Sequence, residues 1–214
     1  MIKTDLPKLH GERQFADNIT SILKGDDYWF WFNVQIPKSG ESKEVDALVY
    51  SKVHKIFIVV EVKGFLLEHI GSIEKGKITL NNGQQRGSPW FQASDNAKKF
   101  KTAFDYLKRN KQHNLESKTF FSPLVSLPMI SREEFNNHFI QSYKGNTYLQ
   151  EMSNSTLFKD DFQNKVTLIN RIEHCLSFPI FGLCLLDNKK TPLNNNELET
   201  FSKLRISRRL LFFR

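Results

Sequence analysis

Hydrophobic and polar positions along the chain form blocks that predict both strands and helices. The apolar run at residues 56–60 has no polar break, which is typical of a strand covered on both faces. A similar run at 44–50 precedes it, and the short polar segment 51–55 suits a hairpin connection. We therefore expect the two runs to be antiparallel neighbours in one sheet. Apolar residues at steps of three and four over 88–107 predict a long helix.

The segments around these runs predict further elements. Before the long helix we expect a helix, a strand, a turn, a small hairpin and a polar loop, in that order, at 11–24, 28–36, 37–40, 71–80 and 81–87. After it we expect a strand within 118–130, a helix start at 131–134, a loop at 145–156 and helices at 157–175 and 194–211. Pro123 moves the strand towards a sheet edge, and residues 178–186 are either a buried strand or a connector. Together these elements predict an α/β fold with a mixed central sheet flanked by helices.

Acidic and basic residues lie at the ends of the two predicted hairpin strands. Glu61 and Lys63 are two apart and leave the same face of their strand. Antiparallel pairing brings Asp46 to the same edge of the sheet. Two carboxylates so close repel each other unless a cation or a proton lies between them, and such oxygen-rich sites hold divalent ions such as Mg²⁺. From the Glu-x-Lys triplet alone, a solvated strand end is the simpler interpretation.

Charge and composition narrow the class of protein. The formal net charge of the 214-residue chain is +8. Such an excess favours a polyanionic partner, nucleic acid first and an anionic membrane second. Alternatively, the positive charge serves only the solubility of the protein. Cys175 and Cys184 are too few for a disulfide framework, and the six scattered histidines do not predict a zinc site. The chain shows no apolar leader, no segment of membrane-spanning length and no Gly-rich phosphate loop. We therefore expect a cytoplasmic protein.

Four short motifs follow one another along the chain. They are Gly11-Glu12-Arg13 opening a helix, Val45-Asp46-Ala47, Val60-Glu61-Val62-Lys63-Gly64, and Ser88-Pro89-Trp90-Phe91-Gln92-Ala93 opening a later helix. In this order the chain resembles the nuclease-related domain (NERD) family of the PD-(D/E)xK nuclease superfamily. It departs from the superfamily in one place, because Val45 stands where a proline usually precedes the first Asp. The resemblance implies a restriction-endonuclease-like αβββαβ core over 8–130 and leaves 131–214 as a C-terminal, helical extension.

The resemblance also implies roles for individual residues. It makes Asp46, Glu61, Lys63, Gln92 and Glu12 the catalytic set. It assigns Mg²⁺ or Mn²⁺ to Asp46 and Glu61, with the Val62 carbonyl and Glu12 as further ligands. From the residues alone, the simpler interpretation is preferred for both: Glu12 is a first-turn acid favoured by the helix dipole, and Gln92 is a surface glutamine.

Basic residues outside this set are candidates for nucleic-acid contact. They are Lys98, Lys99, Arg205, Arg208 and Arg209, which could neutralise phosphates or merely form solvated surfaces.

The expected function is therefore metal-dependent hydrolysis of DNA phosphodiester bonds, in DNA processing, repair or anti-phage defence. A non-catalytic module that binds nucleic acid or docks a partner such as a helicase is the alternative, and RNA is an alternative substrate. Endo- or exonuclease mode stays open, as does the oligomeric state, for which a homodimer is one possibility.

Overall fold

The computed structural model describes residues 9–25, 27–36, 43–109, 120–141 and 147–177, together with Pro7 and Asn196. Its α-helices are α1 (His10–Ile22), α2 (Pro89–Arg109), α3 (Arg132–Phe135), α4 (Thr147–Asn154) and α5 (Lys165–Ser177). Its strands are β1 (Tyr28–Ile36), β2 (Lys43–Ser51), β3 (Ile56–Val62), β4 (Ile70–Glu74), β5 (Lys77–Leu80), β6 (Gln85–Gly87), β7 (Phe120–Leu127) and β8 (Thr156–Phe158). Short 3-10 turns at Leu67–His69 and Lys159–Phe162 and a π-helical turn at Asn136–Ile140 complete these elements.

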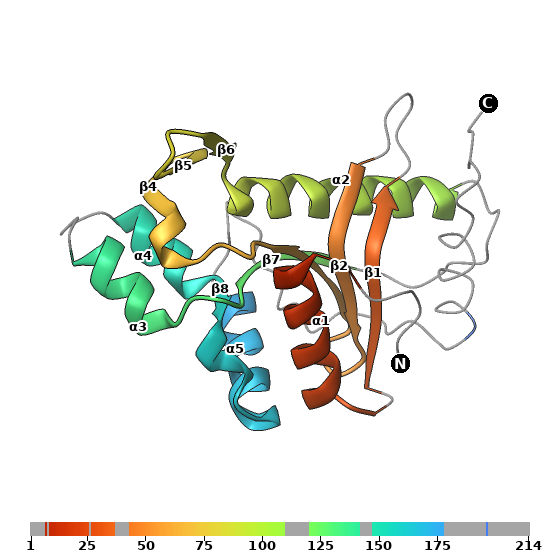
Figure 1. Cartoon of the computed structure of the whole chain (residues 1–214). Coiled ribbons are helices and arrows are strands. Elements are labelled where there is room, and N and C mark those ends of the chain that lie inside the picture. Colours follow the sequence, from red (N-terminus) through yellow and green to blue (C-terminus); the bar gives the residue numbers. More distant parts are fainter. Residues whose placement is uncertain are drawn as a thin grey trace.

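The centre of the fold is a five-stranded sheet in the order β1-β2-β3-β7-β8 (Figure 1). Strands β1 to β3 are antiparallel, whereas β7 and β8 run parallel to β3. Helices α1 and α5 pack on one face of this sheet and α2 packs on the other. The prediction of an α/β fold with a mixed sheet between helices is confirmed, and the element order is consistent with a restriction-endonuclease-like fold.

Strand β1 illustrates how aromatic residues build the two cores. Its even-numbered Phe30 packs in the cluster of α1, and its odd-numbered Trp31 packs in the cluster of α2, as strand alternation requires. Both side chains are buried. Burying a side chain of this size contributes about 1.5–3 kcal/mol each relative to exposure, so the aromatic content of the chain is a main source of core stability.

The alternation reverses at one point, opposite Asp46. Phe32 and Ala47 belong to the cluster on the α1 side, yet Val34 and Val45, two residues away on each strand, belong to the α2 side. The pair between them, Asn33 with Asp46, is missing from the β1–β2 register. Asn33 has a φ of 52°, in the left-handed region that asparagine tolerates better than most residues. The sheet is therefore kinked where β2 carries its acidic residue.

A second, smaller sheet lies at the N-terminal end of α2 (Figure 1). It contains β4, β5 and β6, joined as antiparallel neighbours. The predicted hairpin is confirmed as β4–β5, but the loop predicted at 81–87 is wrong, since it contains β6. All three residues of β6 are exposed, so no hydrophobic alternation marked this strand in the sequence.

Strand β7 is interior, which corrects the edge position predicted from Pro123. It lies between β3 and β8, and Pro123 pairs with Val59 of β3. The proline fits because the pairing of β7 with β8 begins only at Val125. No strand therefore lies beside Pro123 on the β8 side, where its N–H is missing.

Residues after β7 add an outer layer that completes the sheet. The loop predicted at 145–156 is wrong, because α4 and the start of β8 occupy it. The helix predicted at 157–175 is only partly right, because β8 and the turn Lys159–Phe162 come first and α5 begins at Lys165. The capped helix start at Ser131 is confirmed, since its hydroxyl accepts the Glu134 N–H at 3.2 Å.

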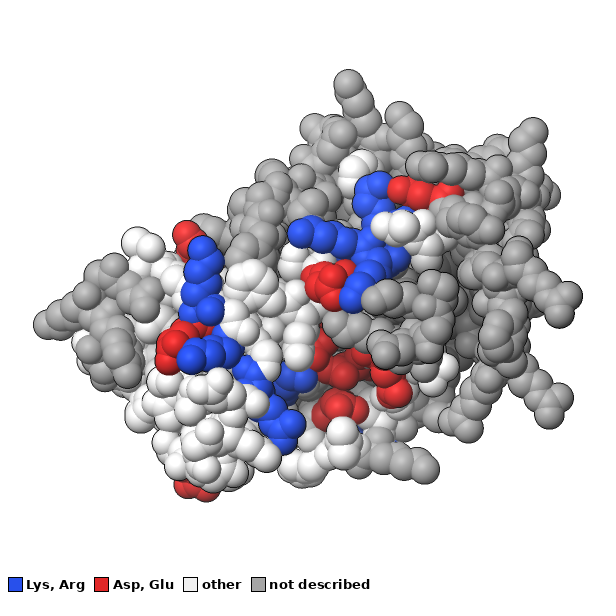
Figure 2. All heavy atoms as spheres, turned by 90° about the horizontal axis from the view of Figure 1, so that it is seen from above, with Lys and Arg blue, Asp and Glu red and all other residues white. Residues whose placement is uncertain are grey.

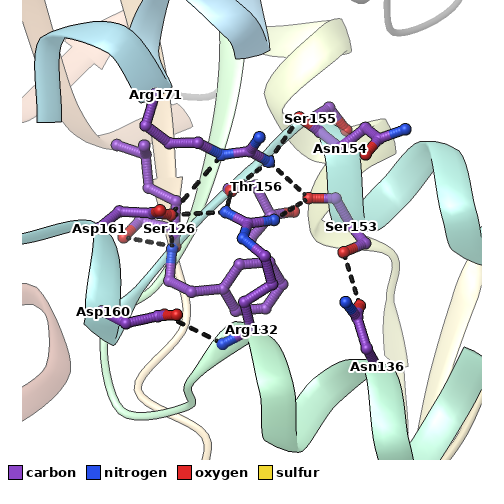
Figure 3. A network of polar contacts seen from close by, with 12 residues as sticks. Ser126, Arg132, Asn136, Ser153, Asn154, Ser155, Thr156, Asp160, Asp161 and Arg171 are labelled. Atoms are coloured by element: carbon purple, nitrogen blue, oxygen red, sulfur yellow. Dashed lines mark hydrogen bonds and ion pairs between the residues drawn. The ribbon is translucent and has the colours of Figure 1, made fainter. Parts of the chain in front are cut away.

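Two arginines tie this layer together (Figure 3). Arg132 donates to Asp161 Oδ2 at 2.7 Å and to the Ser153 carbonyl at 2.8 Å. Arg171 donates to the Ser153 carbonyl at 2.8 Å and to the Thr156 carbonyl at 3.3 Å. Since these carbonyls end α4 and begin β8, the guanidinium groups hold α3, α4, β8 and α5 in one arrangement. Removing one member of such a buried ion pair typically costs several kcal/mol.

Several predictions concern residues outside the described part. They are the turn at 37–40, the segment 178–186, Cys184 and, apart from Asn196, the helix at 194–211. Cys175 is buried as a free thiol, and burial raises its pKa to about 12, which is consistent with a reduced, unreactive cysteine. None of the helices among the described residues combines the length and apolar character needed to cross a bilayer.

Asn33 provides a test of the kink. We expect Asn33→Val to lower the free energy of unfolding by about 1–3 kcal/mol, because a β-branched residue is strained at positive φ. Asn33→Gly should change it by less than about 1 kcal/mol, because glycine adopts this conformation freely. Urea unfolding of the three proteins measures both values, and equal stability of the Val and Gly variants would contradict the kink.

Candidate functional site

Asp46 lies where the ladder between β2 and β3 stops. The pairing of these strands ends at Ala47 and Val60, although both strands continue. Beyond that point Asp46 Oδ2 accepts the backbone N–H of Val62 at 2.6 Å. The side chain thus takes the place of a β2 carbonyl, and it lies between the strands instead of pointing away from one face of the sheet.

Glu61 is held from two directions. Lys63 Nζ donates to its Oε1 at 2.7 Å, and Asn96 Nδ2 donates to its Oε2 at 3.2 Å. Lys63 directly follows β3, the strand that carries Glu61. Asn96 comes from α2, which packs on one face of the sheet. Only 7% of Glu61 is exposed, so this carboxylate is buried between two donors. The predicted grouping of Asp46, Glu61 and Lys63 at one edge of the sheet is present in the structure.

The charges of this group do not balance within the protein. Burial, followed by the nearby charge of Glu61, raises the pKa of Asp46 to about 7. The Val62 N–H bond and Lys63 act in the opposite direction and only partly offset this rise. A carboxylate that is so hard to ionise beside another acid favours a proton or a cation between the two.

Glu12 approaches the group from α1. The preceding Gly11 packs directly on Gly64, where an added Cβ would lie 2.9 Å from the Gly11 Cα, so only glycines permit this contact. Burial raises the pKa of Glu12, with smaller contributions from Glu44 and Glu61, and the charge of Lys63 opposes the rise. Glu12 therefore feels the charges of the site. Among the described residues, however, no three acidic, histidine or cysteine side chains are grouped as ligands of one ion.

Gln92 lies in the first turns of α2, beside the end of β6. A Cβ added to Gly87 would lie 3.1 Å from Gln92 Nε2, so the amide points back towards this glycine. Its Oε1 is buried and has no hydrogen-bond partner among the described residues. Gln92 is thus not the solvated surface glutamine of the simpler interpretation.

Comparison with known families agrees with this geometry. The family model described as the nuclease-related domain matches residues 8–128 of the chain. The chain belongs to this family. The match contains every residue of the group around Asp46 and ends directly after β7. Comparisons with curated proteins and with solved structures found no match.

The donor atoms of this nuclease-related domain suit a hard divalent ion. Asp46 and Glu61 provide two carboxylates, and Val62 adds a backbone carbonyl at the same strand end. Mg²⁺ in proteins is commonly bound through one or two carboxylates together with substrate phosphate oxygens. Two carboxylates therefore fit such an ion, and the roles of Asp46, Glu61, Val62 and Glu12 as its ligands stay predictions.

Lysine and arginine side chains are the candidates for contact with nucleic acid in this nuclease-related domain. The face shown in Figure 2 carries its largest group of Asp and Glu side chains next to Lys and Arg side chains. Lys98 is exposed on α2 and forms no ion pair within the part of the chain that the structure describes. Lys99 is paired with Asp95 on the same helix. Arg205, Arg208 and Arg209 lie outside the described residues.

One residue that contacts Glu61 and one exposed arginine escaped the sequence interpretation. Asn96 contacts Glu61, and Arg86 of β6 is exposed and donates only to the neutral Gln84 among the described residues, at 3.0 Å. The spacing of four between Gln92 and Asn96 was a usable signal for the first, since such residues share a helix face. No signal marked Arg86, because the strand that carries it was not recognised.

The raised pKa of Asp46 predicts a pH-dependent stability. The unfolded chain releases this proton near pH 4, whereas the folded protein keeps it until about pH 7. The folded state thus holds the extra proton between these values, and its stability falls as pH rises through this window. In EDTA, we expect Asp46→Asn to be more stable than the wild type at pH 8, on the order of 1–3 kcal/mol.

The difference should vanish at about pH 3 and below, where Asp46 is protonated in both states. Thermal or urea unfolding from about pH 3 to pH 8 measures it, with the exposed Asp17→Asn as the matched control. A difference that stays constant with pH would show that the carboxyl of Asp46 is not hard to ionise.

Proposed function

We propose that this nuclease-related domain is a metal-dependent phosphodiesterase that hydrolyses DNA. The observation that carries the proposal is the pair of acids, half-buried Asp46 and buried Glu61, with the amine of Lys63 bonded to Glu61. This combination suits a divalent ion and a phosphate together, because the acids attract the cation and the amine attracts the anion. Membership of the family supports nuclease-related chemistry in general.

Each residue has a role that follows from its position. Asp46 and Glu61 would hold Mg²⁺ or Mn²⁺, with the Val62 carbonyl and Glu12 as further candidates. When bound, such an ion supplies Lewis-acid stabilisation of charge at a phosphate and favours deprotonation of an attacking water. Lys63 would stabilise negative charge on the phosphate that is being cleaved. The Gln92 amide would orient the water through its unpaired Oε1, which accepts a hydrogen bond, or the DNA backbone through its Nε2, which donates one.

The preference for DNA rests on the family resemblance and on the positive net charge, which suits any nucleic acid. RNA therefore belongs in the same assay. Work with a helicase, in processing, repair or defence, stays a prediction that the assay with purified protein does not address.

Cleavage should depend on the metal and on both charged partners. We expect labelled linear, circular or single-stranded DNA to be cut in Mg²⁺ or Mn²⁺ and left intact in EDTA. Asp46→Ala and Lys63→Ala should each lower the cleavage rate about 100-fold or more, because each removes a group that stabilises the transition state. Gel analysis of products at equal protein concentration provides the rates.

Two exposed residues provide matched controls for this assay. Asp17→Ala on α1 and Lys165→Ala on α5 remove the same charges at exposed positions outside the predicted site and should cleave like the wild type. Binding without cleavage in every metal would instead support the non-catalytic module. Cleavage of RNA but not of DNA would move the substrate to RNA.

Lys98 should contribute to binding of DNA through phosphate. Its ammonium is exposed and unpaired within the described residues, so Lys98→Ala should reduce the slope of log K against log salt by about 0.9. Lys99→Ala should change the slope less, because Asp95 already neutralises that ammonium. Fluorescence anisotropy with the Asp46→Ala protein measures binding without cleavage. Equal slopes for the Asp46→Ala protein with and without Lys98→Ala would show that Lys98 does not contribute to DNA binding.

A further inference from the structure

Asn96 of α2 is buried and contacts Glu61, one residue of the acidic group formed by Asp46, Glu61 and Glu12. It is 0% exposed and follows Gln92 by four residues, so both lie on the face of α2 that meets the end of β3. Its amide nitrogen must face Glu61, because an amide oxygen in that place would repel the carboxylate. The resulting bond from Nδ2 to Oε2 is 3.2 Å long.

The bond fixes a torsion that is otherwise soft. The last side-chain torsion of glutamate is broad, so a carboxylate bonded at one oxygen can still rotate. Lys63 bonds Oε1 at 2.7 Å and Asn96 bonds Oε2, and the two donors come from different elements. With both oxygens bonded, the plane of the Glu61 carboxylate is set before any ligand arrives.

The chemistry of an amide is suited to this task. A second lysine at this place would also orient Glu61, but its charge would neutralise the acids and weaken their attraction for a cation. A neutral donor orients the carboxylate and leaves its charge available. Lys63 already provides the one positive charge that contacts Glu61 directly among the described residues.

A second observation points to function instead of stability. Asn96 Oδ1, Gln92 Oε1 and Ser88 Oγ are buried and have no hydrogen-bond partner among the described residues. The three residues are spaced by four along the start of α2. A buried polar atom without a partner typically costs about 1–3 kcal/mol, so a row of three is costly if the helix serves packing alone. Asn96, the last residue of the row, is the one that contacts Glu61.

We propose that Asn96 is a positioning residue that orients Glu61 for binding of a divalent cation. The proposal rests on the function proposed above and adds to it a residue that does not touch the substrate. It predicts that loss of the Asn96 amide weakens cation binding and lowers kcat, while KM for DNA stays the same.

The experiment compares three variants at this position with one control. Asn96→Leu keeps the bulk and removes the bond, Asn96→Ala removes both, and Asn96→Gln keeps an amide. Ser94→Ala is the control, because Ser94 is also buried on α2 with an unpartnered hydroxyl but has no bond to Glu61. Circular dichroism and thermal unfolding establish which variants fold. Mn²⁺ affinity is measured by calorimetry, and kcat and KM by cleavage of a labelled duplex.

We expect Asn96→Leu and Asn96→Ala each to bind Mn²⁺ about 10-fold more weakly, as is typical when a residue that orients a metal ligand is lost. Their kcat should fall by a similar factor with KM unchanged. Asn96→Gln should recover part of both losses, and Ser94→Ala should match the wild type. If only one of the Leu and Ala variants folds, the one that folds decides the result.

The outcomes separate this proposal from the function on which it rests. Wild-type Mn²⁺ affinity and kcat in Asn96→Leu or Asn96→Ala would overturn the positioning role and leave the nuclease function in place. A wild-type protein that binds Mn²⁺ but cleaves no nucleic acid would overturn the function, and the Mn²⁺ affinities would still decide the role of Asn96. A wild-type protein that does neither would overturn both proposals.

Discussion

The acidic site depends on an interruption of the central sheet. In a regular antiparallel ladder, the Val62 N–H would bond a β2 carbonyl and Asp46 would point away from one face. The left-handed Asn33 and the reversal of alternation in β1 and β2 end the ladder at Ala47 instead. Asp46 is then free to bond Val62 from within the sheet, next to Glu61. Strain of this kind persists only where the surrounding structure enforces it, and here two well-packed cores hold the strands on either side.

The same interruption makes the site electrostatically demanding. Partial burial of Asp46 and the nearby charge of Glu61 raise the pKa of Asp46 to about 7, and Lys63 offsets only part of this rise. Gly11 and Gly64 bring a third acid, Glu12, within range of these charges. A protein that served stability alone would have no reason to gather these groups. Groups whose electrostatics are this unfavourable are typical of functional sites.

Residues beyond the family match complete the body that carries the site. Strand β8 pairs with the end of β7, and α5 packs on the same face as α1. The network of Arg132 and Arg171 joins the outer elements through backbone carbonyls. Since Lys63 N–H bonds the Ser126 carbonyl of β7 at 3.0 Å, the position of Lys63 depends on the strand to which β8 is attached. The outer layer is thus mechanically connected to the acidic group.

The amino-acid sequence by itself determined the elements with a clear local signal. The apolar run of β3, the aromatic and apolar run of β1 and the helical spacing of α2 required no tertiary context. The antiparallel pairing of 44–50 with 56–60 was enough to predict that Asp46, Glu61 and Lys63 lie together. The tertiary structure alone decided the rest. Strands β6 and β8 have three residues each and exist because a neighbour pairs with them, and Pro123 is tolerated inside the sheet because β8 is so short. The kink at Asn33 lies opposite Asp46, and Asn96 bonds Glu61. In both cases the two residues are far apart in the chain, and no local pattern encodes such contacts.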